Sequence, residues 1–236
     1  VAAVVLLMIA GAAARCGRDQ EHCHYNATAS DTPMCSVLFR GAKGDNKTDD
    51  TAAIQRTIDE CHERHPLGST VLLPKGTYRV TASIALASNL TLQLASHTTL
   101  FSAVTPEMPT AQNPRCPTLY WKHGPTAILC GTNLTNVAVV GEGRGTSTID
   151  GGGWPWYLAG IANHSMQGAG PRSFEVAWSH NVTLARLAFV NSPAWTVHPT
   201  FCRGVVAHHL RIQNPRFTPN TDGFDPDSCS DVVLHD

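Results

Sequence analysis

The sequence predicts an all-β protein, a parallel β-solenoid whose first coil is covered by one α-helix. Three observations support this fold class. Beyond the first third of the chain, apolar residues alternate in short β-branched runs that end at Pro, Gly or polar residues. Related phrases start at Asn181, Arg203 and Ser230, 22 and 27 residues apart, a spacing typical of stacked coils. Only one helical pattern is recognisable, and it precedes these runs.

A β-sandwich is the main alternative, because it also contains many short strands. A sandwich would show hairpin signals between successive strands. Here the phrase NVTLARLAFVNSP is echoed by RGVVAHHLRIQNP and SDVVLHD at one place in each repeat, which favours the solenoid.

The chain begins with an apolar run, Val1 to Ala14, that is too short for a membrane span. Its small residues Ala12-Ala13-Ala14 resemble a signal-peptidase site, so residues 1–15 are interpreted as a signal peptide that is incomplete at its start. A buried strand is the less favoured interpretation, because a polar, Cys-bearing segment follows at once. We assign residues 16–35 to an N-terminal extension and residues 36–236 to an incomplete β-helix domain.

One amphipathic helix is expected from about Asp50 to His65. Asp49 and Asp50 stand where a cap and first-turn acids belong, and Ile54, Ile58 and Cys61 repeat at helical spacing. The helix would cover the open apolar end and the unpaired strand edge of the first coil. The strands that follow are expected in STVLLPKGTYRV, NLTLQLASHTTLF and NLTNVAVVGEG, and then in the three repeated phrases. No second cap is visible near residue 236, so a domain truncated at its C-terminus is expected.

The composition excludes several classes of function. Hydrophobic residues make up 42%, charged residues 15%, and the formal net charge is −1. These values argue against disorder, and they show no basic excess for nucleic acid or an anionic membrane surface. Twelve His would make the protein positive in a mildly acidic medium, which suits a polyanionic ligand. We expect a monomer that has no contact with a membrane once the signal peptide is removed.

The cysteines and the glycosylation sequons predict secretion. Eight Cys fit an oxidising compartment, and the lack of C-x-x-C spacing argues against a zinc site; their pairing stays open. Sequons for N-glycosylation begin at Asn26, Asn46, Asn89, Asn133, Asn163 and Asn181. Six sequons after a signal-like start favour a glycosylated extracellular protein.

Five phrases occur in one order from about residue 38 to 229: FRGAKGDNKTDDTAAIQRTIDEC, VLLPKGTYRV, GTSTIDGGGW, NSPAWTVH and NTDGFDPDSC. In these phrases the chain resembles the family 28 glycoside hydrolases, the polygalacturonases and their relatives; NSPAWTVH followed by NTDG is the most specific part. The resemblance implies a right-handed parallel β-helix. It also implies hydrolysis of α-1,4-galacturonosyl bonds in pectin, with inversion and without a cofactor.

The resemblance further implies that Asp222, in Asn220-Thr221-Asp222, belongs to a set of three catalytic aspartates. Its role would be that of a general base, alongside an Asp about one coil later and therefore beyond residue 236. Adjacent coils lie about 4.8 Å apart, and an inverting site needs carboxyls roughly 6.5–9.5 Å apart, a separation that neighbouring coils can supply. The 236-residue chain by itself is therefore expected to be inactive.

The neighbouring residues have alternative interpretations. Asn220 fixes the local geometry or touches substrate. Asp225 and Asp227, two apart, are expected on one face, opposite Asp222, where they support the site. An acidic trio also suits calcium, but no other ligand is near, so no metal is expected.

Two further residues, Trp195 and His198, either line a sugar cleft or form a buried Trp with a hydrogen-bonded His. The second interpretation is favoured.

Two functional alternatives also stay open: a calcium-dependent, pectate-lyase-like β-helix and a non-catalytic β-helix that binds cell-wall polysaccharide. All these interpretations place the protein outside the cell, at the cell wall, with a pectic galacturonan as its partner.

Overall fold

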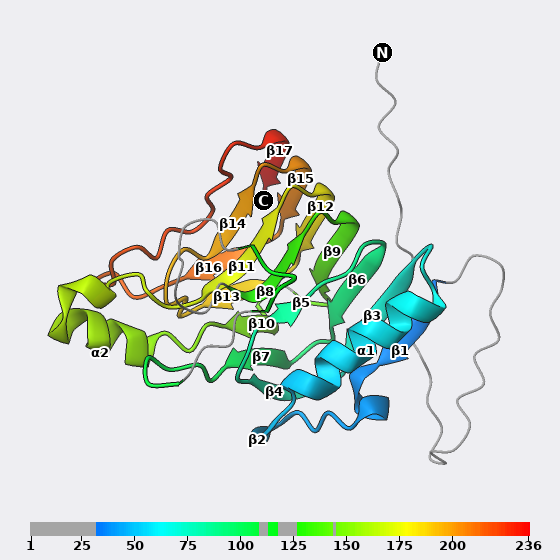
Figure 1. The fold of residues 1–236 in the computed structure, drawn as a ribbon, viewed down its shortest axis with the longest axis horizontal. Helices are drawn as coiled ribbons and strands as arrows, with labels where there is room; N and C mark the ends of the chain where they lie inside the picture. Colours follow the sequence, from blue (N-terminus) through cyan, green and yellow to red (C-terminus); the bar gives the residue numbers. More distant parts are fainter. Residues whose placement is uncertain (1–31, 109–112, 118–126, 144) are drawn as a thin grey trace. The chain divides into compact units, whose positions relative to one another are not determined.

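A computed structural model describes residues 32–108, 113–117, 127–143 and 145–236. Within these residues the chain winds into a right-handed parallel β-helix, so the predicted fold class is confirmed (Figure 1). The predicted signal peptide, most of the predicted extension and the Asn26 sequon lie outside the described residues. No helix in the described part has the length and apolar character needed to cross a membrane.

Each coil contributes strands to parallel sheets that run the length of the stack. The first sheet, in spatial order, contains β1 (Met34–Ser36), β3 (Ser69–Leu73), β6 (Leu90–Leu94), β9 (Thr135–Gly141), β12 (His180–Ala185), β15 (Arg203–His208) and β17 (Ser230–His235). The second contains β16 (Arg211–Gln213), β13 (Ala188–Val190), β10 (Ser147–Asp150), β7 (Thr98–Ser102), β4 (Gly76–Val80) and β2 (Asp45–Asp49). The third contains β14 (Val197–Thr200), β11 (Arg172–Ala177), β8 (Ala127–Thr132) and β5 (Ile84–Ala85). We call this third sheet the site sheet.

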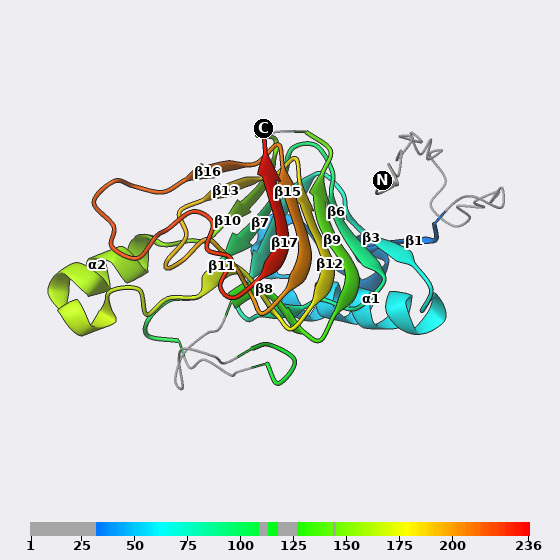
Figure 2. The same ribbon diagram turned by 90° about the horizontal axis from the view of Figure 1, so that it is seen from above.

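The core is made of inward side chains that stack in register from coil to coil. Leu90 pairs with Val137, Val137 with Val182, and Val182 with Val205, and all four are buried. The strands of the first sheet, which carry these residues, run side by side in Figure 2. Every coil therefore buries its apolar residues against its neighbours, as a solenoid requires.

The expected helix is α1 (Thr51–Arg64), and it covers the first coils. Its apolar face buries Ile54, Ile58 and Cys61. A disulfide joins Cys61 to Cys35 on β1. Because β1 begins at Met34, the first coil starts inside the segment assigned to the extension, and that boundary was wrong. A three-residue strand is too short for its alternation to be recognised.

Of the two aspartates expected at the start of the helix, Asp50 occupies the N-cap position. Its buried carboxylate makes no capping bond to the helix. It accepts the backbone N–H groups of Lys43 at 2.7 Å and Gly44 at 3.0 Å, which fixes the loop before β2. Asp49 instead accepts the N–H of Thr51 at 3.0 Å.

A second helix, α2 (Trp154–Ala162), separates β10 from β11 and was not predicted. Its sequence WPWYLAGIA is apolar on all sides, so no helical period is visible. Two rings attach it to the coils: Trp156 Nε1 donates to the carbonyl of Val104 at 2.9 Å, and Tyr157 donates its hydroxyl to the carbonyl of Ser192 at 2.7 Å. Figure 2 shows α2 beside the segment that follows β16.

An asparagine ladder fixes the turns that lead into the first sheet. Asn89, Asn136 and Asn181 all adopt the left-handed conformation, with φ of 54–55°. Asn136 Nδ2 donates to Asn89 Oδ1 at 2.9 Å, and Asn181 Nδ2 donates to Asn136 Oδ1 at 3.0 Å. Asn tolerates this conformation better than most residues, and the ladder satisfies its amides.

We expect Asn136→Ala to lower the free energy of unfolding by about 1–2 kcal/mol, because two exposed hydrogen bonds are lost and Ala is strained at positive φ. Asn136→Gly is the matched control. It loses the same bonds without the strain, so it should be the more stable of the two variants. Urea denaturation measures both; equal stability of wild type and the Ala variant would contradict the ladder's role.

The five sequons within the described residues differ in exposure and hydrogen bonding. Asn46, Asn133, Asn163 and Asn181 are exposed, and Asn89 is half-buried. The amide nitrogens of Asn89 and Asn181 donate hydrogen bonds, Asn89 to the carbonyl of Pro66 and Asn181 within the ladder. Glycosylation stays a prediction at all six positions.

Candidate active site

The segment between β16 and β17 lies on the site sheet as the next coil after β14. Thr196 N–H donates to the carbonyl of Asp222 at 2.8 Å, Asp225 N–H to that of Val197 at 2.8 Å, and Asp227 N–H to that of Pro199 at 2.9 Å. The isolated parallel bridges Val197–Phe224 and Thr200–Asp227 continue the register. The candidate aspartates are therefore held by the backbone of the preceding coil, as the repeat spacing predicts.

Asn214 fixes the loop that leads to Asp222. Its Oδ1 accepts the N–H of Ser192 at 2.8 Å, and its Nδ2 donates to Thr196 Oγ1 at 2.8 Å and to the carbonyl of Thr221 at 2.9 Å. Our sequence reasoning missed this residue. The dipeptide Asn-Pro at 214–215 is a turn signal that could have drawn attention to it.

The side chains of Asp222 and Asn220 are both exposed. Asn220 has a φ of 56° and lies against Gly168, where a Cβ atom would come within 2.9 Å of the Asn220 side chain. This packing supports a role for Asn220 in local geometry. Asp222 thus combines a fixed backbone with a carboxylate that solvent and a polymer can reach.

Asp225 occupies a different environment. It is half-buried, and its Oδ2 atom is buried without a hydrogen-bond partner in the described structure. Burial and then the negative charge of Asp222 raise its pKa, while His198 opposes the shift. The sequence put Asp225 on the face opposite Asp222, yet the two carboxylates lie close enough to interact. The segment is not one extended strand, since only Phe224 and Asp227 form bridges, so simple alternation does not apply. Asp227 accepts the hydroxyl of Ser228 at 2.8 Å.

The raised pKa of Asp225 has a consequence for stability. The folded protein binds the proton more tightly than the unfolded chain, so stability falls as pH rises from the ordinary value of 3.8 through the raised pKa. We expect Asp225→Asn to raise the unfolding temperature near pH 7, with the gain vanishing at about pH 3. Thermal denaturation across this range measures the difference. A gain that is the same at both pH values would contradict the electrostatic cause.

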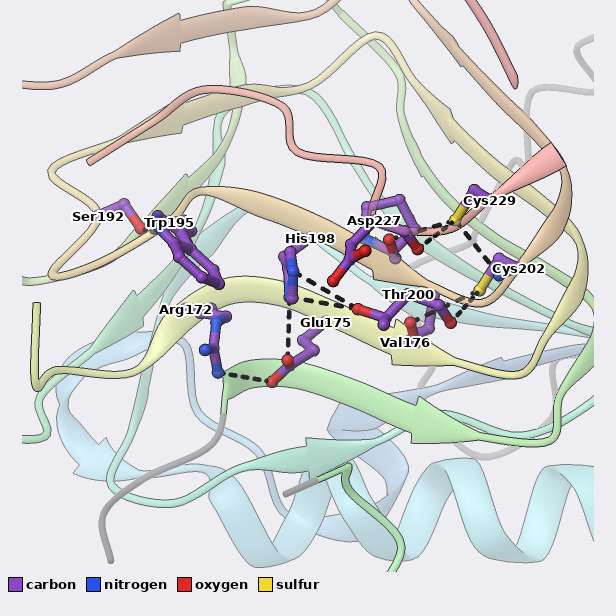
Figure 3. Close-up of polar contacts among 11 residues, drawn as sticks. Arg172, Glu175, Val176, Ser192, Trp195, His198, Thr200, Cys202, Asp227 and Cys229 are labelled. Atoms are coloured by element: carbon purple, nitrogen blue, oxygen red, sulfur yellow. Dashed lines mark hydrogen bonds and ion pairs between the residues drawn. The ribbon is translucent and has the colours of Figure 1, made fainter. Parts of the chain in front are cut away.

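Strands β11 and β14 carry a buried network of charged side chains, which lies beside the candidate aspartates (Figure 3). Glu175 is fully buried: its Oε2 accepts from Arg172 Nη1 at 3.0 Å, and its Oε1 lies 3.0 Å from His198 Nδ1. The ring of Trp195 lies 4.7 Å from the His198 ring and 4.9 Å from the Arg172 guanidinium carbon. The hydrogen-bonded His198 was predicted correctly, but Trp195, which was expected to be buried, is only half-buried. Arg172 and Glu175 were not recognised. Two charges in the short strand RSFEVA, beside Phe, Val and Ala, were the available signal.

The arrangement offers an accessible carboxylate, a nearby carboxyl that retains its proton to higher pH, and a partly exposed indole. These are groups suited to proton transfer and to contact with a sugar ring. Within the described ranges, no group of three or more His, Cys, Asp or Glu side chains is placed to hold a metal ion.

The chain is similar in sequence to known polygalacturonases. A family model described as rhamnogalacturonase A/epimerase, pectate lyase-like, matches residues 34–113. A probable polygalacturonase of Vitis vinifera is 30% identical over 244 residues, which cover 100% of this chain and 48% of the relative. An endo-polygalacturonase of Pectobacterium carotovorum is 28% identical, over 85% of this chain and 50% of its own length. The chain thus spans about half the length of these relatives.

Solved structures show the same fold. A family 28 exopolygalacturonase of Yersinia enterocolitica superposes with a TM-score of 0.71 at 21% identity, over 88% of this chain and 43% of that one. The polygalacturonase of Erwinia carotovora gives a TM-score of 0.66 at 22% identity, over 89% of this chain and 56% of that one. The chain is therefore similar in sequence to polygalacturonases over about half of their length, and it shares the parallel β-helix fold of these solved structures.

Proposed function

We propose that the full-length protein is a glycosidase that hydrolyses α-1,4-galacturonosyl bonds of pectic galacturonan with inversion. Asp222 acts as general base on the attacking water in this proposal. The similarity to named polygalacturonases supports the substrate class. Asn220, Asp225 and Asp227 act as supporting residues.

One observation supports the assignment of Asp222 more than any other. Its carboxylate is exposed on the outer side of the site sheet, while its backbone carbonyl accepts the N–H of Thr196 and its loop is fixed by Asn214. A general base must reach a water molecule and must also be held in place, and Asp222 meets both conditions.

The stacking of coils gives the mechanism its geometry. A second carboxyl on the next coil would lie about 4.8 Å further along the sheet, and a side-chain offset brings the pair to the roughly 6.5–9.5 Å of an inverting site. We assign contact with a pyranose ring to the half-buried Trp195, which precedes the Thr196 backbone contact to Asp222. The sugar carboxylates make the substrate a polyanion.

The test is an assay of the purified full-length protein on polygalacturonate. We expect new reducing ends without products that absorb in the ultraviolet, and NMR of the first product should show inverted anomeric configuration. Unsaturated, ultraviolet-absorbing products that disappear with a chelator would indicate the lyase alternative. Binding to the polymer without either product would indicate a non-catalytic wall protein.

Secretion to the cell wall, glycosylation and a monomeric state complete the proposal. The sequons and the apolar start support secretion. The disulfides Cys35–Cys61 and Cys116–Cys130 support maturation in an oxidising compartment.

A further inference from the structure

Cys202 and Cys229 are the free cysteines of the described residues, and they lie on neighbouring coils. Arg203 on β15 pairs in register with Ser230 on β17, so the two cysteines directly precede a paired position. The N–H of Cys202 donates to Cys229 Sγ at 3.2 Å. Figure 3 shows both sulfur atoms side by side at the edge of the site sheet.

The backbone geometry fits a covalent bond. Paired positions on adjacent parallel strands lie about 4.8 Å apart, within the roughly 4.4–6.8 Å between Cα atoms that a disulfide spans. Both sulfurs face backbone carbonyls: Cys202 Sγ lies 3.3 Å from the carbonyl oxygen of Thr200, and Cys229 Sγ lies 3.3 Å from that of Pro199. These are weak thiol contacts, so oxidation would break few strong bonds.

We propose that Cys202 and Cys229 form a third disulfide, which ties the segment holding Asp225 and Asp227 to the coil of β14. The thiolate of Cys229, the less buried of the two, attacks an oxidant of the disulfide class and forms a mixed disulfide. Cys202 then attacks the Cys229 sulfur. Two protein thiols are oxidised, and the oxidant RSSR is reduced to two RSH, which take up the two thiol protons.

The environment explains why the bond would persist once formed. Burial raises the pKa of Cys202 to about 11 and also raises the pKa of Cys229, so both cysteines are poor leaving groups when an external thiolate attacks the bond. The buried Cys202 sulfur is also poorly accessible to such a thiolate. The link would stay in place while the candidate site works, and it would restrain residues 218–229 between their backbone contacts to β14. This proposal does not depend on the proposed activity.

The test uses the full-length protein, secreted from a eukaryotic host. Free thiols are alkylated in denaturant, and trypsin is added without reduction. Cleavage after Arg186, Arg203 and Arg216 leaves the two cysteines on separate peptides. We expect mass spectrometry to find these peptides linked, about 2 Da lighter than their sum because two hydrogens are lost. The Cys35–Cys61 link in the same digest is the internal control.

Complete alkylation of Cys202 and Cys229, beside an intact Cys35–Cys61 link, would overturn the proposal. A second measurement tests the restraint. In a Cys202→Ser/Cys229→Ser variant we expect amide hydrogen exchange in residues 218–229 to be about tenfold faster, with α1 unchanged. Linked peptides together with unchanged exchange would show that the disulfide forms without restraining the segment.

Discussion

Replacement of Asp222 by Asn in the full-length protein is expected to lower kcat on polygalacturonate by about 10²–10⁴-fold, the contribution of a positioned general base. The amide keeps the size of the side chain but cannot accept the proton of the attacking water. Because Asp222 is exposed and only its backbone is used by the fold, the unfolding temperature should not fall, and loss of the Asp222 charge beside Asp225 should raise it slightly near pH 7. Steady-state kinetics and thermal denaturation of the same preparation test both parts.

Asp231→Asn is the matched control. Asp231 is also an exposed aspartate in the same coil, with a φ of 56° that Asn tolerates, and its carboxylate contacts Arg203 at the surface. We expect this variant to keep wild-type kcat. If both variants retain activity, Asp222 is not the base; if both lose it, the cause is a general disturbance of the coil. KM should change little in either variant, since the exposed carboxylate is proposed to act on water and not to grip the polymer.

The fold and the place of Asp222 could be predicted because both depend on local, repeated patterns. The alternation of apolar residues around Leu90, Val137 and Val182 is visible in each coil, and stacking follows from it. The contact between the Thr196 N–H and the Asp222 carbonyl joins residues 26 positions apart, a separation similar to the spacing of the repeated phrases. Short elements escaped this reasoning: β1 has three residues, and α2 has no apolar periodicity.

The buried network and the environment of Asp225 could not be predicted, because both depend on distances between coils. Glu175 and His198 are 23 positions apart and meet only through the register of β11 with β14. The disulfide Cys116–Cys130 likewise links a loop to a strand through tertiary packing. A sequence shows that a charge exists, but burial and partner decide what it does.

The buried network of Arg172, Glu175 and His198 should have the second large effect, on the stability of the fold. We expect Glu175→Gln to lower the free energy of unfolding by about 3–5 kcal/mol, measured by chemical denaturation, because the buried Arg172 guanidinium loses the carboxylate that Glu175 supplies. Glu60→Gln is the control: Glu60 also contacts two guanidinium groups, those of Arg40 and Arg64, but its side chain is 33% exposed. The Glu60→Gln change should lower the free energy of unfolding by about 0–1 kcal/mol, because water screens an ion pair at the surface.

A double variant, Arg172→Met with Glu175→Leu, separates charge from packing. Replacing both members of a buried ion pair with apolar side chains of similar volume is often neutral, so this protein should recover most of the lost stability. His198 would keep Thr200 Oγ1, 3.4 Å from its Nδ1, as an acceptor. If the double variant is as unstable as Glu175→Gln, the network contributes through its packing around Trp195. If it recovers, the cost of the single change comes from the loss of the negative charge that Glu175 places beside Arg172, and Glu175 stabilises the wall of the candidate site electrostatically.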